Sequence, residues 1–152
     1  MIQIKKSETA DTRTCDWSKV SEEQLLESTQ QHINDVAYGL FFFATKLKEA
    51  SINHDKTKLK EMPWFYREFK EGFRTQTWYE MHKKVERHHC SVPEGVRDDI
   101  NLVDVIEHIV DCVMAGMARS GSVYDLKIDN ETLQKAFKNT KELLQKNVEV
   151  VP

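Results

Sequence analysis

The chain has 152 residues, enough for one domain that buries about 70% of the surface its unfolded form exposes. Lys and Arg total 22 and Asp and Glu total 25, so the net charge of −3 excludes the strongly basic character of a general nucleic-acid binder. With 39% hydrophobic residues, 31% charged residues and only 5 Gly and 3 Pro, the composition indicates an ordered and largely helical protein.

The first predicted helix follows a polar N-terminal leader over residues 1–20. Ser21 to Gln24 match a capping box, and apolar residues then recur at helical spacing. This pattern predicts one long helix from about Glu22 to Ala50.

The middle of the chain alternates between connections and helical segments. Ser51 to Pro63 is polar and ends in a proline, which predicts a loop or short helical turn that carries His54 and Asp55 before an aromatic segment. A further helix is predicted from about Thr77 to His89. Cys90 to Asp99, with a proline and a glycine, is typical of a loop.

A broad apolar stripe from Leu102 to Met117 predicts a central buried helix. Asp99 or Asn101 would cap its start, and Gly121 would end it.

The last predicted elements are a loop over Ser122 to Ile128 and a helix capped by Asp129. Almost no strand is expected. The sequence therefore predicts an all-α fold of about four to six helices, with a single helical domain over residues 21–150 after the leader 1–20.

Location and redox state follow from three further patterns. The longest apolar run, Ala37 to Ala44, is far shorter than the roughly 20 residues of a membrane helix. Residues 1–14 lack the apolar segment of a secretory signal. Cys15, Cys90 and Cys112 have no disulfide or zinc-ribbon spacing, which favours reduced thiols. We expect a cytoplasmic protein with no membrane partner.

Metal-ligating side chains are numerous for a chain of this size. The candidates are His32, His54, His82, His88, His89, Asp55, Asp104 and Asp111. Asp104, Glu107 or His108, and Asp111 are spaced so that they fall on one side of the predicted central helix, and buried carboxylates need partners. A divalent metal held by imidazoles and carboxylates would satisfy several of these groups at once, whereas salt bridges to Arg87, Arg119 or Lys58 are the alternative.

The helix predicted around residue 82 offers a second set of ligands. His82, Glu86 and His89 are spaced i, i+4 and i+7, so they share one stripe of a continuous helix. His88 would point about 100° away from His89, and both remain candidates.

Part of this pattern resembles the H…HD…D signature of the HD-domain metal-dependent phosphohydrolases. His32 corresponds to the first histidine, and His54-Asp55 forms the contiguous pair. Asp111, within Val-Asp-Cys-Val, resembles the final aspartate, although Asp104 on the same face is the alternative.

Two further features extend the resemblance. His54-Asp-Lys-Thr-Lys58 resembles the HDxxK variant, whose lysine contacts phosphate, and His88-His89 resembles the double histidine of the two-metal branch. A closer likeness, over about residues 32–148, is to an uncharacterised HD-like family common in bacteriophage and prophage genomes. It rests on Trp78-Tyr79, on Glu86 to His89, on Asn101 to Glu107 and on Met114 to Gly121.

The resemblance implies a hydrolytic centre with one or two divalent transition-metal ions, Mn, Fe, Co, Ni or Zn. The implied ligands of the first ion are His32, His54, Asp55 and Asp111. A second ion would take His82 with His88 or His89, and Asp55 would bridge.

The remaining roles concern substrate and proton transfer. Lys58 and Arg87 would meet the charge on the phosphate. Glu86 or Asp104 would orient water as general base beside Asp55.

The leading hypothesis is a metal-dependent phosphohydrolase that acts on a small nucleotide or nucleotide-derived phosphoester, as a nucleotidase or phosphodiesterase. The likeness to a phage family implies a phage-encoded protein in the host bacterial cytoplasm. The alternatives are a non-catalytic protein that binds a nucleotide or a partner on an HD-like scaffold, and a purely structural interaction protein. Self-association is left open.

Overall fold

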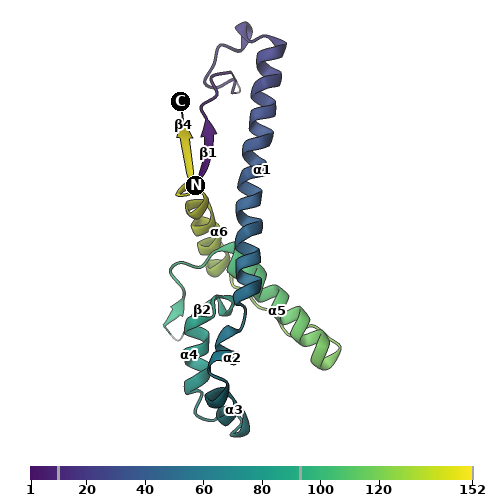
Figure 1. Ribbon diagram of the computed structural model, residues 1–152, viewed down its shortest axis with the longest axis vertical. Helices are drawn as coiled ribbons and strands as arrows, with labels where there is room; N and C mark the ends of the chain where they lie inside the picture. The colour runs from purple at the N-terminus through teal and green to yellow at the C-terminus, as the bar shows by residue number, and fades with distance from the viewer. Residues whose placement is uncertain (10, 93, 152) are drawn as a thin grey trace. The chain divides into compact units, whose positions relative to one another are not determined.

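The computed structural model describes residues 1–9, 11–92 and 94–151 (Figure 1). Its elements in chain order are β1 (Ile2–Lys5), η1 (Trp17–Lys19), α1 (Glu22–Asn53), α2 (Lys56–Lys60), α3 (Met62–Lys70), α4 (Thr77–Val85), η2 (Arg87–His89), β2 (Ser91–Val92), β3 (Gly95–Val96), α5 (Leu102–Ser120), α6 (Asn130–Gln145) and β4 (Val148–Val151). The chain divides into two compact units, Met1–Thr45 with Glu142–Pro152, and Lys46–Lys141. In the described part of the chain, no helix is both long and apolar enough to span a membrane.

The first unit joins the two ends of the chain in a small parallel sheet. β1 pairs with β4 in a register that places Ile2 opposite Val148 and Lys5 opposite Val151. The Ile2 amide donates to the carbonyl of Asn147 at 2.7 Å. The fold is therefore mainly α, and the expectation of an all-α fold is wrong in this detail. Each strand has only four residues and its partner lies at the other end of the sequence, so no local pattern marks the pair.

α1 confirms the predicted long helix and its start. The Ser21 amide donates to Gln24 Oε1 at 3.0 Å, and the Gln24 amide donates to Ser21 Oγ at 3.2 Å. This reciprocal pair is the predicted capping box. The helix continues beyond Ala50 to Asn53.

The polar leader packs against α1. Ser28 is the buried residue of that helix, and Ser7 Oγ donates to its hydroxyl at 3.3 Å. Gln31 Nε2 donates to the carbonyl of Lys5 at 2.6 Å. These bonds connect the strand β1 and the segment after it to the first half of α1.

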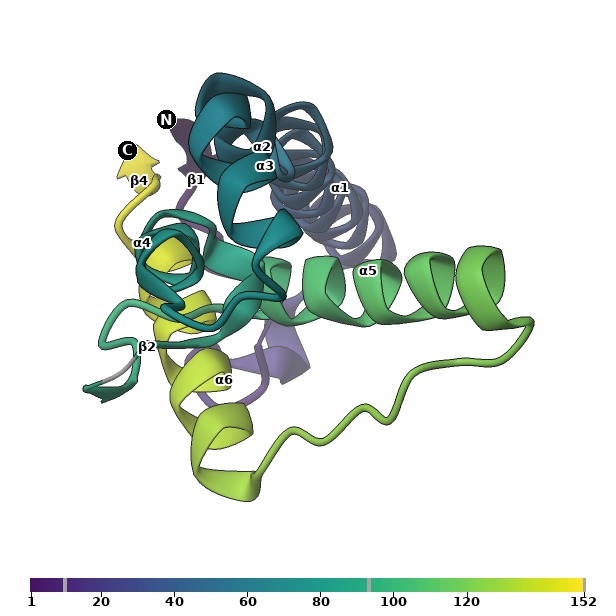
Figure 2. The same ribbon diagram turned by 90° about the horizontal axis from the view of Figure 1, so that it is seen from below.

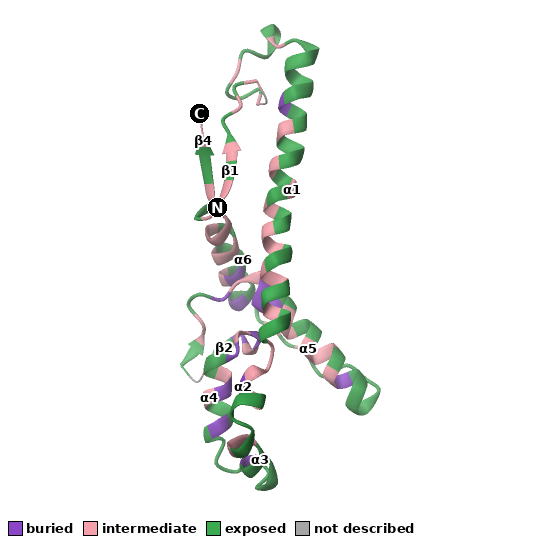
Figure 3. Cartoon of the chain, in the orientation of Figure 1, coloured by how far each residue is buried: buried purple, intermediate pink, exposed green. Residues whose placement is uncertain are grey.

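The second unit, Lys46–Lys141, holds a small hydrophobic cluster. Its members, Cys90, Ile100, Val105 and Ala136, are all less than one-tenth exposed. Figure 3 shows buried residues gathered around α4, η2 and the start of α5. The core of this unit therefore lies where η2 meets the first turns of α5.

α5 begins and ends as predicted but is less buried than expected. Asn101 caps its first turn, and Gly121 ends it in the left-handed conformation. The predicted central burial is wrong for most of the stripe. Its exposed members are Ile106, Ile109, Val110, Met114 and Met117.

Three local details differ from the predictions for the middle segment. α4 ends at Val85, because Glu86 adopts an extended conformation with ψ of 118° before the 3-10 turn η2. Pro63 lies in the first turn of α3, where a missing amide hydrogen costs nothing, instead of ending a connection. The predicted loop after Cys90 contains the short antiparallel pair β2 and β3.

α6 confirms the last predicted helix. Asp129 Oδ1 accepts a hydrogen bond from the Thr132 amide at 2.7 Å, as expected of a cap. Between α5 and α6 the chain runs in an extended course back toward the start of α6 (Figure 2).

Candidate metal centre

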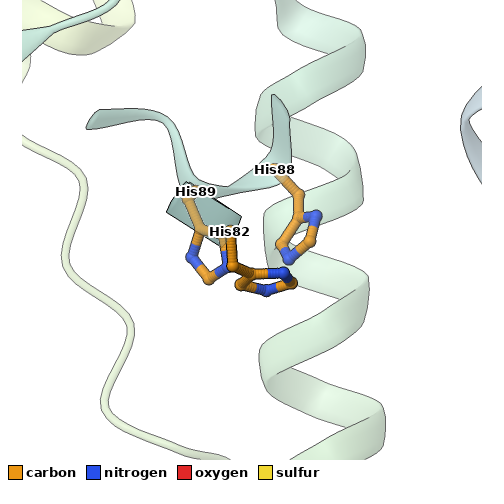
Figure 4. Close-up of side chains that lie close together, drawn as sticks. All are labelled: His82, His88 and His89. Atoms are coloured by element: carbon orange, nitrogen blue, oxygen red, sulfur yellow. The ribbon is translucent and has the colours of Figure 1, made fainter. Parts of the chain in front are cut away.

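Five histidine and aspartate side chains from separate segments of the second unit converge. His54 and Asp55 lie at the junction of α1 and α2, and His82 lies on α4. His88 comes from η2, and Asp111 from α5. His89 adjoins the group, and Figure 4 shows the rings of His82, His88 and His89 close together. The convergence requires the chain to turn sharply at Asp55 and again after α4.

Asp55 occupies the first of these turns. Its φ of 56° is left-handed, a conformation that Asp tolerates better than most residues. The Lys58 amide donates to its carbonyl at 2.9 Å, which starts α2. The Lys58 ammonium donates to Oδ2. Oδ1 is buried and has no hydrogen-bond partner in the described residues.

A hydrogen-bonded chain determines the tautomer of His82. Thr57 Oγ1 donates to Glu86 Oε1 at 2.7 Å, and the Thr57 amide donates to the same oxygen at 2.8 Å. Since its one proton is used, Thr57 Oγ1 accepts from His82 Nδ1 at 2.6 Å. The lone pair of neutral His82 is then on Nε2, which lies 3.3 Å from the unpartnered Asp55 Oδ1. Two electron-pair donors at this separation repel each other, and a cation between them would stabilise both.

Glu107 orients His54 in the same way. His54 Nδ1 lies 2.9 Å from Glu107 Oε1 and donates its proton to that carboxylate. In the neutral ring, His54 Nε2 therefore presents its lone pair to Asp55 Oδ2 and Asp111 Oδ1, each 3.6 Å away. Burial would raise the pKa of Glu107, but His88 and His54 beside it bring that pKa below its ordinary value.

His88 lies between the two halves of the cluster. Its Nε2 is 3.8 Å from Asp55 Oδ1 and 3.9 Å from Asp111 Oδ2, and its ring is almost completely buried. Neither ring nitrogen of His88 has a hydrogen-bond partner in the part of the chain that the structure describes, and His89 Nε2 has none either.

Two groups of three side chains have ligand atoms within 4.8 Å of one another. One group is His82, His88 and His89, and the other is His54, His88 and Asp111. His88 belongs to both, and Asp55 presents one carboxylate oxygen to each. The donor set, imidazole nitrogens and carboxylate oxygens, suits a divalent transition metal.

The charge state of the cluster favours metal binding. Burial lowers the pKa of His82 to about 4, and burial with the neighbouring His88 lowers that of His89 to about 3. Both rings are therefore neutral near pH 7, as metal ligands must be. Burial would raise the pKa of Asp55, but the hydrogen bond and charge of Lys58 bring it below its ordinary value.

Arg87 and Asp104, predicted as substrate-binding and catalytic groups, bind each other. Arg87 Nε and Nη2 donate to the two carboxylate oxygens of Asp104 at 2.8 and 2.7 Å. Arg87 also donates to Asp99, and Asp104 accepts the Asn101 amide as part of the cap of α5. Their roles in substrate binding and catalysis stay predictions. In the structure, their hydrogen bonds connect η2 to the start of α5.

Of the other predicted site residues, some lie at the cluster and one lies outside it. Glu86, proposed as a general base, is buried and acts on His82 through Thr57. Asp111, not Asp104, is the aspartate that lies among the imidazoles. His32 lies in the first unit, about six turns before the end of α1, and belongs to neither ligand group found among the described residues. Its role as a ligand stays a prediction.

Thr57 and Glu107 are functional candidates to which the sequence analysis gave no role, although Glu107 was placed on the same face as Asp104 and Asp111. Both hold a histidine by its Nδ1 atom. Glu107 precedes Asp111 by one helical turn, a spacing that places both on one face of α5. Thr57 lies within the His54 to Lys58 motif, but only the folded chain shows that its hydroxyl faces His82.

Searches against protein-family models, curated proteins and solved structures find no match to this chain.

Proposed function

We propose that the second unit binds one or two divalent transition-metal ions and that the protein is a metal-dependent phosphohydrolase that acts on a nucleotide or nucleotide-derived phosphoester. The observation that carries the proposal is the pair His82 Nε2 and Asp55 Oδ1. These atoms face each other across 3.3 Å, and in the neutral ring of His82, whose proton is on Nδ1, no proton lies between them.

The residues present fit such a centre. His88 belongs to both ligand groups, but a neutral imidazole has one lone pair and would bind one ion, either with His54 and Asp111 or with His82 and His89. Asp55 could contribute an oxygen to either group. A bound divalent ion lowers the pKa of coordinated water to about 7 and polarises a phosphoryl oxygen. Manganese, iron, cobalt, nickel and zinc suit this mixture of nitrogen and oxygen ligands.

The chain itself contributes orientation and positive charge. Thr57 and Glu107 accept from the Nδ1 atoms of His82 and His54, so in the neutral rings the lone pair is on Nε2 and points at the site. Lys58 supplies an ammonium group beside Asp55, where it can donate to the oxygens of an anionic substrate. The HDxxK pattern of these residues, with its resemblance to the HD-domain phosphohydrolases, supports a phosphoester as the substrate. The likeness to a phage family supports a phage-encoded enzyme.

The test combines elemental analysis with an activity screen. Protein purified without chelator should contain a transition metal. After removal of that metal, added Mn²⁺, Co²⁺, Ni²⁺ or Zn²⁺ should restore hydrolysis of nucleoside phosphates or cyclic nucleotides. Asp55→Asn should lower activity at least about 100-fold, more than the loss of a residue that only orients a ligand.

Asp125→Asn is the matched control, because the side chain of Asp125 is 77% exposed and pairs only with Lys127 among the described residues. Metal binding without turnover of any phosphoester would contradict the catalytic proposal and favour a binding protein. No metal binding at all would leave the cluster as a structural network of polar groups.

A further inference from the structure

An aromatic pocket adjoins the histidine cluster within the second unit. Its volume is about 550 Å³, within the range of small-molecule sites. Its wall is formed by Phe65, Phe69, Phe73, Trp78 and Tyr79. His82 and His89 of the metal centre also line it, so the pocket and the candidate metal site share residues.

The aromatic wall has an inner and an outer layer. Phe65 lies 4.4 Å from Trp78, and Trp78 stacks on His82 at 4.7 Å with an interplanar angle of 18°. Trp78 is therefore enclosed between two rings and supports the site. Phe69 is 60% exposed and Tyr79 37% exposed, although both line the pocket. These outer rings have exposed surface at the pocket, and the Lys83 ammonium lies over one face of Tyr79, 4.9 Å from the ring centroid.

Polar groups are present at the same pocket. Trp78 is 1% exposed, and its Nε1 is a buried donor without a partner among the residues described. Gln76 lines the pocket in a left-handed conformation with φ of 55°. Glu68 holds the flanking residues, since its Oε1 accepts from Thr75 Oγ1 at 3.1 Å and from the Trp78 amide at 2.8 Å. The start of α4 thus contributes two residues with polar side chains, Gln76 and Trp78, to the lining of the pocket.

Positive charge completes the pocket. Lys58 and Arg119 both line it, and Arg119 has no ion pair within the described ranges. A ligand that filled this space would place an apolar plane against the rings and negative charge near Lys58, Arg119 and the histidines. A phosphate ester without a ring would leave the aromatic wall unused.

We propose that this pocket binds the base of a mononucleotide, with Phe69 and Tyr79 as the stacking residues and with the phosphate toward the histidine cluster. This assignment rests on the proposed function for the position of the phosphate. It narrows the substrate class to nucleoside phosphates small enough for one base to occupy the pocket. Stacking tolerates any base, because every base has a π face.

The test compares substrates that carry a base with one that lacks it. Hydrolysis of the four ribonucleoside 5′-monophosphates is compared with that of ribose 5-phosphate. Phe69→Ala should lower kcat/KM for the nucleotides by about 5- to 150-fold, the usual loss when one stacked ring is removed. Its effect on ribose 5-phosphate should stay within about twofold. Tyr66→Ala is the control, because Tyr66 is 59% exposed on the same helix and does not line the pocket.

A binding measurement separates this inference from the proposed function. Nucleoside binding to the metal-free protein, followed by tryptophan fluorescence, should weaken in Phe69→Ala and not in Tyr66→Ala, whether or not any substrate is hydrolysed. Equal losses on both substrates, or equal effects of the two variants, would overturn the assignment. So would concentration-dependent self-association that Phe69→Ala abolishes, since the ring would then belong to an interface between copies of the chain.

Discussion

The position of one proton determines which ring nitrogen of His82 presents a lone pair to the candidate site. The Thr57 hydroxyl has one proton and two neighbours, Glu86 and His82, and only the carboxylate lacks a proton of its own. That one constraint places the lone pair of His82 on Nε2, toward Asp55. The site therefore depends on a hydroxyl that binds no ligand itself.

Replacement of Thr57 by valine should weaken metal binding. Thr57→Val keeps the shape of the side chain but removes the hydroxyl, so His82 is free to take the other tautomer. We expect metal affinity to fall about 10- to 100-fold, as is typical when a group that orients a ligand is lost. Titration of the apo-protein with Co²⁺, followed by absorption, measures the effect. Thr57→Ser retains the hydroxyl and should bind metal like the unaltered protein; a similar loss in both variants would mean that the methyl group matters and not the hydrogen bond.

Lys58 offers a second test, on the rate of the reaction. Its ammonium pairs with Asp55, which places its positive charge beside the candidate metal centre, and under the proposed function it would contact the substrate phosphate. Lys58→Ala should keep the metal content and lower kcat/KM about 10- to 100-fold, the cost of one charge-assisted contact. Lys60→Ala, at an exposed position of the same short helix, should have little effect. Equal small losses in both variants would reduce Lys58 to a source of diffuse positive charge.

The sequence predicted the residue types of the site better than their partners. His54, Asp55, His82, His88, His89 and Asp111 were all selected, and the structure brings these six together. The prediction that His82, Glu86 and His89 share one stripe assumed a continuous helix. The extended conformation of Glu86 interrupts that helix. Thr57 was not selected and Glu107 was placed beside Asp111 without a role, because a residue that orients a ligand is recognisable only from the contacts it makes in the fold.

At the scale of elements, backbone contacts explain which glycines can be replaced. A Cβ on Gly116 of α5 would lie 2.5 Å from the Ser122 carbonyl oxygen and 2.6 Å from the Tyr124 amide nitrogen. A Cβ on Gly39 of α1 would meet only Leu144, at 3.9 Å. The first glycine lets the returning segment pass close to α5, and the second has no such role.

Replacement of these two glycines by alanine should change the free energy of unfolding in opposite directions. Gly116→Ala should destabilise the protein by about 1–3 kcal/mol, because backbone atoms must move. Gly39→Ala should stabilise it by about 0.5–1 kcal/mol, because alanine loses less backbone entropy in a helix. Thermal unfolding followed by circular dichroism compares them. A Gly116→Ala variant as stable as Gly39→Ala would show that the segment after α5 does not pack as described.

Glu68 connects α3 to the start of α4 and should make stability depend on pH. Burial would raise its pKa, but hydrogen bonds from Thr77, Trp78 and Thr75 bring the pKa below 4.5. A carboxyl whose pKa is lower in the folded state stabilises the fold above its ordinary pKa, and this contribution is lost as the pH falls through the folded-state value.

Removal of this charge should therefore make the stability of the protein depend less on pH between about pH 7 and pH 3. Glu68→Gln should have a lower urea midpoint than the unaltered protein at pH 7, and a smaller difference at pH 3. Glu71→Gln, at the neighbouring exposed position, provides the comparison. A constant difference between Glu68→Gln and the unaltered protein across this range would exclude Glu68 as the titrating group.

The helices whose first residue is a side-chain cap could be predicted from the sequence. The strands that pair with a segment far away in the sequence could not. α1, α5 and α6 begin at side-chain caps that a few neighbouring residues encode, which is why Ser21, Asn101 and Asp129 were identified. β1 and β4 pair across the whole length of the chain, and nothing local distinguishes them. The stripe on α5 predicted its helical conformation, yet periodicity alone does not say how much of a stripe is covered.

For the whole molecule, the candidate ligands are distributed unevenly between the two units. The residues of both ligand groups lie between His54 and Asp111, inside the second unit, whereas the β1–β4 sheet belongs to the first. A ligand stabilises only those parts whose opening destroys its site. Metal binding should therefore protect one unit selectively, and the sheet that joins the chain ends should not respond.

Hydrogen exchange with and without metal tests this coupling. At a free metal concentration of about 100 times Kd, binding adds about 2.7 kcal/mol to the stability of the site, which slows exchange through its opening about 100-fold. Amides of α4, η2 and the first turns of α5 should show this slowing after Mn²⁺ is added and lose it with a chelator. Amides of β1 and β4 should exchange at the same rate in both conditions. Asp55→Asn should abolish the difference in the second unit. Equal protection of β1 and the site would instead mean that the two units open as one, because only a shared opening reaction transmits the binding energy to residues that touch no ligand.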